Sequence, residues 1–515
     1  MSNSADRERL IVVSNRLPFV LKREPSDAWR ITPGTGGLVS ALLPVLRDRG
    51  GKWIGWSGTV GEHAGVQDAL DRSVRDAGYE LKAVDLTADE VHNFYFGFSN
   101  EIIWPLFHDH HSFCNFDPLY WQAYVQVNRK YAAAIAAHTE PGDFIWVHDY
   151  HLINVAMELR RRDIENRTGF FLHIPFPSPD IFLKLPWRFE LLHALLQYGL
   201  VGFQTLRDRR NFVQCLRTLC REVSVTGKGQ VVDVTADGHS LRLGTFSISV
   251  DFKSLERESS SDAVAAECQR LHNIRGQRQM ILGVDRLDYT KGIPNRLRAF
   301  EEALKRFPEL QTRVTLVQVV VPSREDIPMY HELRTEVERL VGHINGSFTR
   351  AAGWVPIHYL FRSLSKTELL SFYRTADIAL VTPLKDGMNL VCKEFCACSI
   401  DETSVLILSE FAGAAAQLQN GTLIVNPYDI EGMAEAIYEA YRMAPEERTQ
   451  RMRRMRRSIA KQDIFWWVDS FLKAAIAKDL SAFPLLEDFN PADRMDPFAH
   501  RRVESHGSTR SDRTR

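Results

Sequence analysis

The sequence repeats one unit along most of its length: a short apolar segment, a polar or glycine-containing turn, and a helix pattern. The unit is clear at residues 143–162, DFIWVHDYHLINVAMELRRR, and again at 280–304. Parallel strands cannot be joined by a tight turn, so each pair needs a crossover connection, and this repeat supplies one. The pattern therefore predicts an α/β fold built on doubly wound parallel sheets with helices on both faces.

The regular pattern loosens over residues 246–262, FSISVDFKSLERESSSD. A chain of 515 residues is long enough for two or three domains, each with its own core. We therefore expect one Rossmann-like domain over residues 1–250 and a second over 251–485. Residues 486–515 are polar and arginine-rich, which predicts a disordered tail.

The charge balance, the terminus and the cysteines argue against a nucleic-acid partner, a membrane location and a metal site. With a net charge of −1, the protein as a whole has no positive potential that would attract nucleic acid or an acidic membrane surface. The N-terminus is polar, and no run approaches ~20 apolar residues, so we expect neither a signal peptide nor a membrane span. The seven cysteines are scattered, which predicts reduced thiols and no metal site. We expect a cytoplasmic protein, and a homo-oligomer is compatible with the sequence.

A polar loop with two cations follows the apolar segment MILGV at 280–284. It holds Arg286 and Lys291, just before Gly292, Pro294 and an amphipathic helix. The carboxyl ends of parallel strands are where α/β sheets bind ligands, and a helix N-terminus adds positive potential there. The guanidinium and the ammonium would suit a diphosphate. The local pattern fits ordinary solvated loop charges equally well.

Other apolar segments also end in residues suited to binding. Gly36 and Gly37 open a helix after a glycine-rich loop, although many such loops only turn the chain. Tyr95 and Trp104 lie in an aromatic segment and would serve either as a sugar platform or as core residues. Further polar residues at the ends of apolar segments are Arg16, His148, Asp149, His173, Arg324, Asp386, Asn389 and Glu394.

A set of short motifs carries a family resemblance. In order they are VVSNR, GGL, FSNEIIWPLFH, VHDYHL, LHIPFPSP, GFQT, DRLDYTKGIP, VPSRED, INGSF and TPLKDGMNLVCKEF. Each is short, but the ordered set resembles the trehalose-6-phosphate synthases, a family of retaining glucosyltransferases. The resemblance implies the GT-B architecture, in which two Rossmann-like domains face one another across a cleft. It also implies a C-terminal helix that packs back on the first domain.

The resemblance assigns roles to individual residues of this chain. It implies that the residues around glucose 6-phosphate are Arg16, Tyr95, Trp104, Asp149 and Arg324. The donor set comprises Gly36, Gly37, Arg286 and Lys291 at the diphosphate, Asp386, Gly387, Met388 and Asn389 at the glucose, Leu390 and Val391 beside them, Glu394 at the ribose and Leu364 near the base. His173 is implied near the transferred sugar. Some family members have phenylalanine at the position of Leu364, so the choice among UDP, GDP and ADP stays open.

The expected mechanism is a front-face transfer without a cofactor. A retaining glycosidase needs two carboxylates about 5 Å apart, and neither the sequence nor the resemblance identifies such a pair. Arg286 and Lys291 would instead stabilise the departing diphosphate, and a phosphate oxygen would take the acceptor's proton. His173 and Asp149 complete the predicted catalytic set. The alternatives are a sister synthase with another phosphorylated acceptor, such as glycerol 3-phosphate, and a catalytically silent sugar-phosphate sensor.

Overall fold

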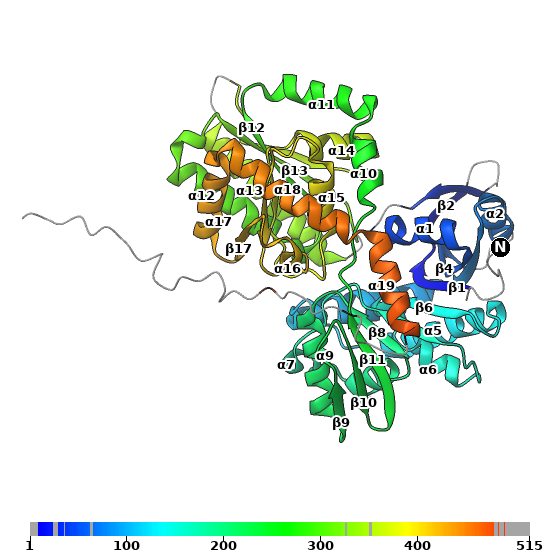
Figure 1. Ribbon diagram of the computed structural model, residues 1–515. Helices are drawn as coiled ribbons and strands as arrows, with labels where there is room; N and C mark the ends of the chain where they lie inside the picture. Colours follow the sequence, from blue (N-terminus) through cyan, green and yellow to red (C-terminus); the bar gives the residue numbers. More distant parts are fainter. Residues whose placement is uncertain are drawn as a thin grey trace, which may run out of the picture.

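The computed structural model describes residues 9–23, 29–34, 37–61, 65–324, 327–349, 353–477, 483 and 489. They form two lobes with a parallel sheet in each (Figure 1). The predicted tail, 486–515, lies outside the described residues apart from Phe489, and Gly36 also lies outside them. No described helix is long and apolar enough to cross a membrane.

The described part of the first lobe contains a nine-stranded sheet, in which the strands from β5 to β11 run parallel. β10 and β9 extend it antiparallel beside β11. The strands in sheet order are β5 (Tyr79–Leu86), β4 (Gly51–Val60), β1 (Leu10–Arg16), β6 (Phe144–His148), β7 (Thr168–Phe171), β8 (Leu200–Phe203), β11 (His239–Thr245), β10 (Val231–Ala236) and β9 (Val223–Thr226). A separate hairpin pairs β2 (Phe19–Arg23) with β3 (Trp29–Pro33).

The described part of the second lobe contains a six-stranded, fully parallel sheet. Its strands in sheet order are β14 (Ile357–Phe361), β13 (Val314–Val321), β12 (Gln279–Arg286), β15 (Ile378–Val381), β16 (Val405–Ser409) and β17 (Leu423–Val425). In both sheets the order reverses beside the first strand, between β1 and β6 and between β12 and β15. Ligands of doubly wound sheets bind outside the carboxyl ends of the strands at such a reversal.

Helices connect and cover the strands. Those of the first lobe are α1 (Gly37–Arg49), α2 (Val66–Ser73), α3 (Ala88–Glu90), the π-helix η1 (Val91–Ile103), α4 (Trp104–Phe107), η2 (His111–Phe113), α5 (Pro118–His138), η3 (Tyr150–Leu152), α6 (Val155–Arg160), α7 (Pro179–Phe182), α8 (Arg188–Leu195) and α9 (Leu206–Leu219). Those that follow are α10 (Phe252–Ser259), α11 (Asp262–Arg275), η4 (Tyr289–Lys291), α12 (Ile293–Arg306), η5 (Pro308–Leu310), α13 (Pro328–Phe348), α14 (Lys366–Thr375), α15 (Leu390–Cys398), α16 (Ala415–Leu418), α17 (Ile430–Arg442), α18 (Pro445–Lys461) and α19 (Ile464–Ile476).

The last helix returns to the first lobe, as predicted (Figure 1). Phe471 of α19 stacks on Trp146 of β6, with ring centroids 4.3 Å apart. Gly169 of β7 and Gly202 of β8 make room for this ring, since a Cβ on either would lie 2.8 Å from a ring carbon of Phe471. Trp467 of α19 packs on the same tryptophan at 5.0 Å. The buried aromatic contacts of Phe471 and Trp467 stabilise the packing of α19 on the sheet of the first lobe.

The basic run in α18 is only partly a solvated surface. Arg448 is buried and donates to the carbonyls of Ala440 and Tyr441 at the end of α17, at 2.7 and 3.1 Å. Arg456 is buried as well and donates to the carbonyl of Cys396 at the end of α15, at 2.9 Å. A helix C-terminus carries partial negative charge and unpaired carbonyls, so a buried arginine is stabilised there. The two arginines therefore anchor α18 to the second lobe.

Candidate active site

The loop after β15 of the second lobe meets segments of the first lobe that follow β7 and α4. Gly387, in the loop after β15, lies so close to the first lobe that a Cβ there would be 2.2 Å from the carbonyl oxygen of His173. Beside it, Lys385 donates to Asp109 of the first lobe at 2.6 Å. A side chain at Gly387 would force the two loops apart, so the glycine is needed for this approach. We call this region the inter-lobe junction.

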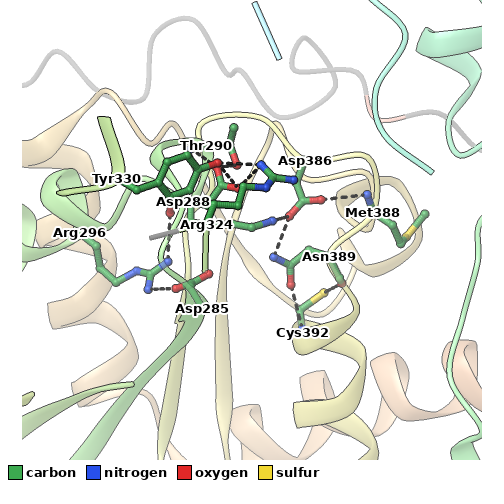
Figure 2. Close-up of polar contacts among 11 residues, drawn as sticks. Asp285, Asp288, Thr290, Arg296, Arg324, Tyr330, Asp386, Met388, Asn389 and Cys392 are labelled. Atoms are coloured by element: carbon green, nitrogen blue, oxygen red, sulfur yellow. Dashed lines mark hydrogen bonds and ion pairs between the residues drawn. The ribbon is translucent and has the colours of Figure 1, made fainter. Parts of the chain in front are cut away.

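Arg324 reaches from the second lobe to an aromatic residue of the first. Its guanidinium carbon lies 4.3 Å from the ring centroid of Trp104. Its Nη1 donates to the hydroxyl of Tyr330 at 2.7 Å and lies 3.6 Å from a carboxylate oxygen of Asp288 (Figure 2). The backbone of Arg324 has a φ of 51°, which is sterically uncommon for a residue with a Cβ and is often found at functional sites. Trp104 is buried, yet it contributes to the junction.

A second arginine lies on aromatic side chains of the first lobe. The guanidinium carbon of Arg16, at the end of β1, is 4.4 Å from the ring centroid of Trp56 and 5.5 Å from that of Tyr95. The Tyr95 ring is stacked on His151 at 5.9 Å. Arg16 is exposed, so its donors remain open to an anion, and a planar guanidinium suits a phosphate.

Asp149 follows β6 with a φ of 74°. Its carboxylate accepts from the backbone N–H of His173 at 3.1 Å. Desolvation raises its pKa to about 7, although the backbone donors and the charge of Arg286 act in the opposite direction. Arg286 belongs to the second lobe, and its charge lowers the pKa of Asp149 in the first lobe. A predicted donor residue and a predicted acceptor residue therefore lie within electrostatic reach of one another.

The raised pKa predicts an acidic limb in the reaction. Asp149 can accept from sugar hydroxyls best as a carboxylate, and below about pH 7 the neutral acid dominates. We expect kcat/KM for the acceptor to fall about 10-fold between pH 8 and pH 6. Asp149→Asn should flatten this limb, while the ionisation of the substrate phosphate affects both proteins equally. An identical limb in the two profiles would assign it to the substrate.

The same shift has a consequence for stability. The folded-state pKa of Asp149 is raised above the ordinary value of 3.8, so the folded protein holds the proton more tightly than the unfolded chain does. Its contribution to stability is therefore present at pH values below about 4 and is lost as the pH rises toward 7.

The loop that carries Arg286 and Lys291 rests on a buried arginine. Arg296 of α12 is fully buried and pairs with the carboxylate of Asp285 at the end of β12 (Figure 2). Its guanidinium also donates to Gln318 of β13 at 3.2 Å and to the hydroxyl of Thr382 at 3.1 Å. A further contact, at 3.4 Å, reaches the carbonyl of Lys291. This network connects two neighbouring strands, the end of β15 and the cationic loop.

Lys291 is paired within the site itself. Its Nζ donates to Asp386 at 2.5 Å. Asp386 also accepts from the side-chain amide of Asn389 at 3.2 Å (Figure 2). Desolvation would raise the pKa of Asp386, but the Lys291 ammonium holds it below its ordinary value. Asn389 has a φ of 73° and accepts from the N–H of Cys392 at 3.2 Å, which caps α15. The cap fixes the glycine-containing loop that precedes the helix.

The remaining predicted donor residues come from both lobes. Glu394 of α15 accepts from the hydroxyl of Tyr373 at 2.9 Å, and desolvation raises its pKa. Gly37 begins α1, whereas Gly36 is outside the described residues. One hydrophobic cluster contains Met388 and has three predicted residues packed against it: Leu364, Leu390 and Val391.

The sequence alone did not identify several residues that contact and orient the predicted site residues. Tyr330 lies in α13, where no local motif pointed to it, yet its hydroxyl contacts both Arg324 and Asp288. Asp288 stands between the two predicted diphosphate cations, and this position was the available signal. His148 was noted only as a strand-end residue, although its ring contacts His173.

Tyr330→Phe tests whether the hydroxyl holds Arg324 in place. A hydrogen bond to a charged group contributes more than a neutral one, so we expect the KM for the acceptor to rise about 5- to 10-fold and the donor KM to stay unchanged. Initial rates against each substrate measure this. Tyr438→Phe is the matched control, because that hydroxyl accepts from Arg442 at 3.2 Å on the exposed side of α17. Equal changes in both KM values would contradict this assignment.

The fold and the site together define a class of protein. Two Rossmann-like lobes, each with the strand-order reversal of a nucleotide-binding fold, bring cations, carboxylates and aromatic side chains to a shared junction. This is the arrangement of a GT-B glycosyltransferase. The chain belongs to glycosyltransferase family 20, whose family model matches residues 8–477.

The comparisons with known proteins cover nearly the whole chain. Trehalose-6-phosphate synthase of Mycolicibacterium smegmatis is 41% identical over 475 residues, which are 91% of this chain and 92% of that protein. A crystal structure of α,α-trehalose-phosphate synthase (UDP-forming) from Burkholderia xenovorans was determined in complex with glucose-6-phosphate. Its sequence is 34% identical, the match covers 91% of this chain and 99% of that protein's chain, and the TM-score is 0.81. A solved E. coli structure bound with UDP-2-fluoro glucose is 36% identical, with the same coverage and a TM-score of 0.82.

Proposed function

We propose that this protein transfers glucose from a nucleoside diphosphate glucose, UDP-glucose in the first instance, to glucose 6-phosphate. The product is α,α-trehalose 6-phosphate, and the anomeric configuration of the donor is retained. The observation that carries this proposal is the contact of Arg324 with Trp104 across the junction. This contact supports the proposal because a guanidinium, which suits a phosphate, lies in one lobe beside an aromatic side chain of the other.

The proposed reaction exchanges one bond at the anomeric carbon. The bond from this carbon to the diphosphate oxygen breaks, and a bond to the acceptor's anomeric oxygen forms on the same face. The proton of the acceptor hydroxyl passes to the departing phosphate oxygen. Arg286 and Lys291 stabilise the negative charge that develops there. For this purpose the ammonium of Lys291 must exchange its contact with Asp386 for one with phosphate.

The domain of residues 1–250 would bind the acceptor, and the domain of residues 251–485 would bind the nucleotide sugar. Arg324 would reach from the second domain to the acceptor phosphate. β11 ends at Thr245 and α10 begins at Phe252, which supports a boundary between them. Beyond this boundary, α19 returns to the first lobe and packs on β6. We infer a cytoplasmic enzyme of trehalose synthesis, with a role in osmoprotection.

The test is a donor and acceptor panel with purified protein. UDP-, GDP- and ADP-glucose are each combined with glucose 6-phosphate or glycerol 3-phosphate, and the products are identified by NMR. We expect trehalose 6-phosphate from UDP-glucose, with both anomeric centres α. A glycerol product alone would establish the sister synthase instead. Donor binding without turnover in any combination would establish a sugar-phosphate sensor.

A further inference from the structure

Two histidines of the first lobe are paired ring to ring at the carboxyl end of its sheet. His148 is the last residue of β6, and His173 follows β7. The Nδ1 of His148 lies 3.1 Å from the Nε2 of His173, and the rings are 30° apart in orientation. His148 is completely buried, whereas His173 is partly exposed. The inner ring can therefore reach a substrate only through the outer one.

The surroundings of the inner ring are apolar and aromatic. Trp146, two residues earlier on β6, has its ring centroid 4.6 Å from that of His148. Trp467 of α19 lies 6.4 Å from His148 and 6.2 Å from His173. Burial lowers the pKa of His148 well below its ordinary value and that of His173 to about 3. Both imidazoles are therefore neutral at physiological pH.

Neutrality restricts how the two rings can share a proton. A neutral imidazole has one N–H and one lone pair, so one ring must donate across the 3.1 Å contact and the other must accept. If the Nδ1 of His148 accepted, the Nε2 of that ring would carry a proton. This Nε2 is buried and has no partner among the described residues. A buried N–H without an acceptor is a rare and costly defect.

The neighbouring tryptophan favours the other arrangement. The indole nitrogen of Trp146 is also buried without a partner among the described residues, and it can only donate. A proton on the Nε2 of His148 would therefore add a second unpaired N–H to the same buried aromatic region. The proton of His148 therefore belongs on Nδ1, which then donates to His173.

We propose that His148 is a positioning residue: its Nδ1–H donates to the Nε2 of His173 and holds His173 in the tautomer protonated at Nδ1. His173 then presents an N–H to ligand oxygens and no free lone pair. It can orient or stabilise the transferred sugar, but it cannot take a proton from the acceptor. This inference rests on the proposed function for its catalytic consequence, whereas the tautomer itself does not depend on that function.

The position of His173 gives the tautomer its importance. Its backbone N–H donates to Asp149 at 3.1 Å, and its carbonyl contacts the loop of Gly387. Its Nδ1 has no hydrogen bond with the described residues, and the residue as a whole is partly exposed. The proton that His148 directs to Nδ1 is thus available at the inter-lobe junction, between the proposed acceptor and donor residues.

NMR of the full-length protein labelled with ¹⁵N-histidine tests the tautomer directly. The His173 ring signals are assigned by their loss in His173→Asn. In the wild type we expect a protonated Nδ1 and an unprotonated Nε2 on His173. In His148→Phe, which keeps a ring but removes the donor, we expect His173 to gain the Nε2-protonated form. A wild-type His173 that is protonated at Nε2 would overturn the proposal without any variant.

Kinetics then separate positioning from a structural role. The contribution of one hydrogen bond corresponds to about 10-fold in rate, so we expect kcat of His148→Phe to fall about 10-fold with the KM for the acceptor unchanged. His148→Asn keeps an N–H near the former Nδ1 and should recover most of kcat. His193→Phe, an exposed histidine of α8, is the control. Equal losses in the Asn and Phe variants would refute positioning by the N–H. A wild type with the expected tautomer but no synthase activity would refute only the proposed function.

Discussion

Arg286→Ala is expected to lower kcat about 10²- to 10³-fold while leaving the fold intact. The guanidinium lies at the exposed end of β12, so its removal creates no buried cavity. In the proposed reaction it contacts charge that grows as the diphosphate departs, and such a donor stabilises the transition state more than the ground state. Steady-state rates with UDP-glucose and glucose 6-phosphate measure the loss.

Two controls make this result specific. Arg454→Ala removes an exposed arginine of α18 and should leave kcat unchanged. Circular dichroism and the melting temperature of Arg286→Ala should match those of the wild type. Near-normal turnover in Arg286→Ala would remove this residue from the mechanism and return it to the status of a solvated loop charge.

Arg296→Met is expected to destabilise the protein by about 3–5 kcal/mol. Arg296 is fully buried, and its partner Asp285 is 6% exposed, so the substitution leaves an unpaired buried carboxylate. Breaking one half of a buried ion pair costs more than the pair itself contributes, because the remaining charge stays desolvated. Thermal and urea denaturation measure the loss, and the cationic loop above Arg296 should lose donor affinity as well.

A double variant identifies the cause. Arg296→Met combined with Asp285→Asn removes the stranded charge and should recover a large part of the stability. Arg451→Met breaks an exposed pair with Glu447, whose atoms are 2.8 Å apart, and should cost less than about 1 kcal/mol. If the single and double variants were equally destabilised, the loss would reflect the missing packing of the arginine stem.

The sheet architecture could be predicted because it depends on local chemistry. Apolar segments such as 280–284 and the helices after them are short-range patterns, and parallel pairing follows from their alternation. Both sheets and the return of α19 to the first lobe were confirmed. The burial of Arg448 and Arg456 in the basic helix α18 could not be predicted from local pattern, because it depends on how α18 packs against the ends of α17 and α15.

The candidate site shows the same division. Arg286 and Asp386 could be predicted to lie at one edge of the second-lobe sheet, because they follow the parallel strands β12 and β15. Their approach to Asp149, which follows a strand of the other sheet, could not be predicted in this way. Tyr330 could not be predicted either, since its contact with Arg324 depends on how α13 packs. Nor could the ion pair of Lys291 with Asp386, since the conformations of the two strand-end loops decide which of their side chains meet.

By itself, the sequence determined the parallel α/β class, the strand-end loops that carry the functional groups and, through its ordered motifs, the expected family. Only the tertiary structure shows which groups meet. Arg324 lies on Trp104, and Gly387 lies against His173. The imidazoles of His148 and His173 pair beside Trp467 of α19. The physical reason is range. Strand and helix patterns arise from neighbouring residues, whereas desolvation, ion pairing and proton placement depend on atoms that only the folded chain brings together.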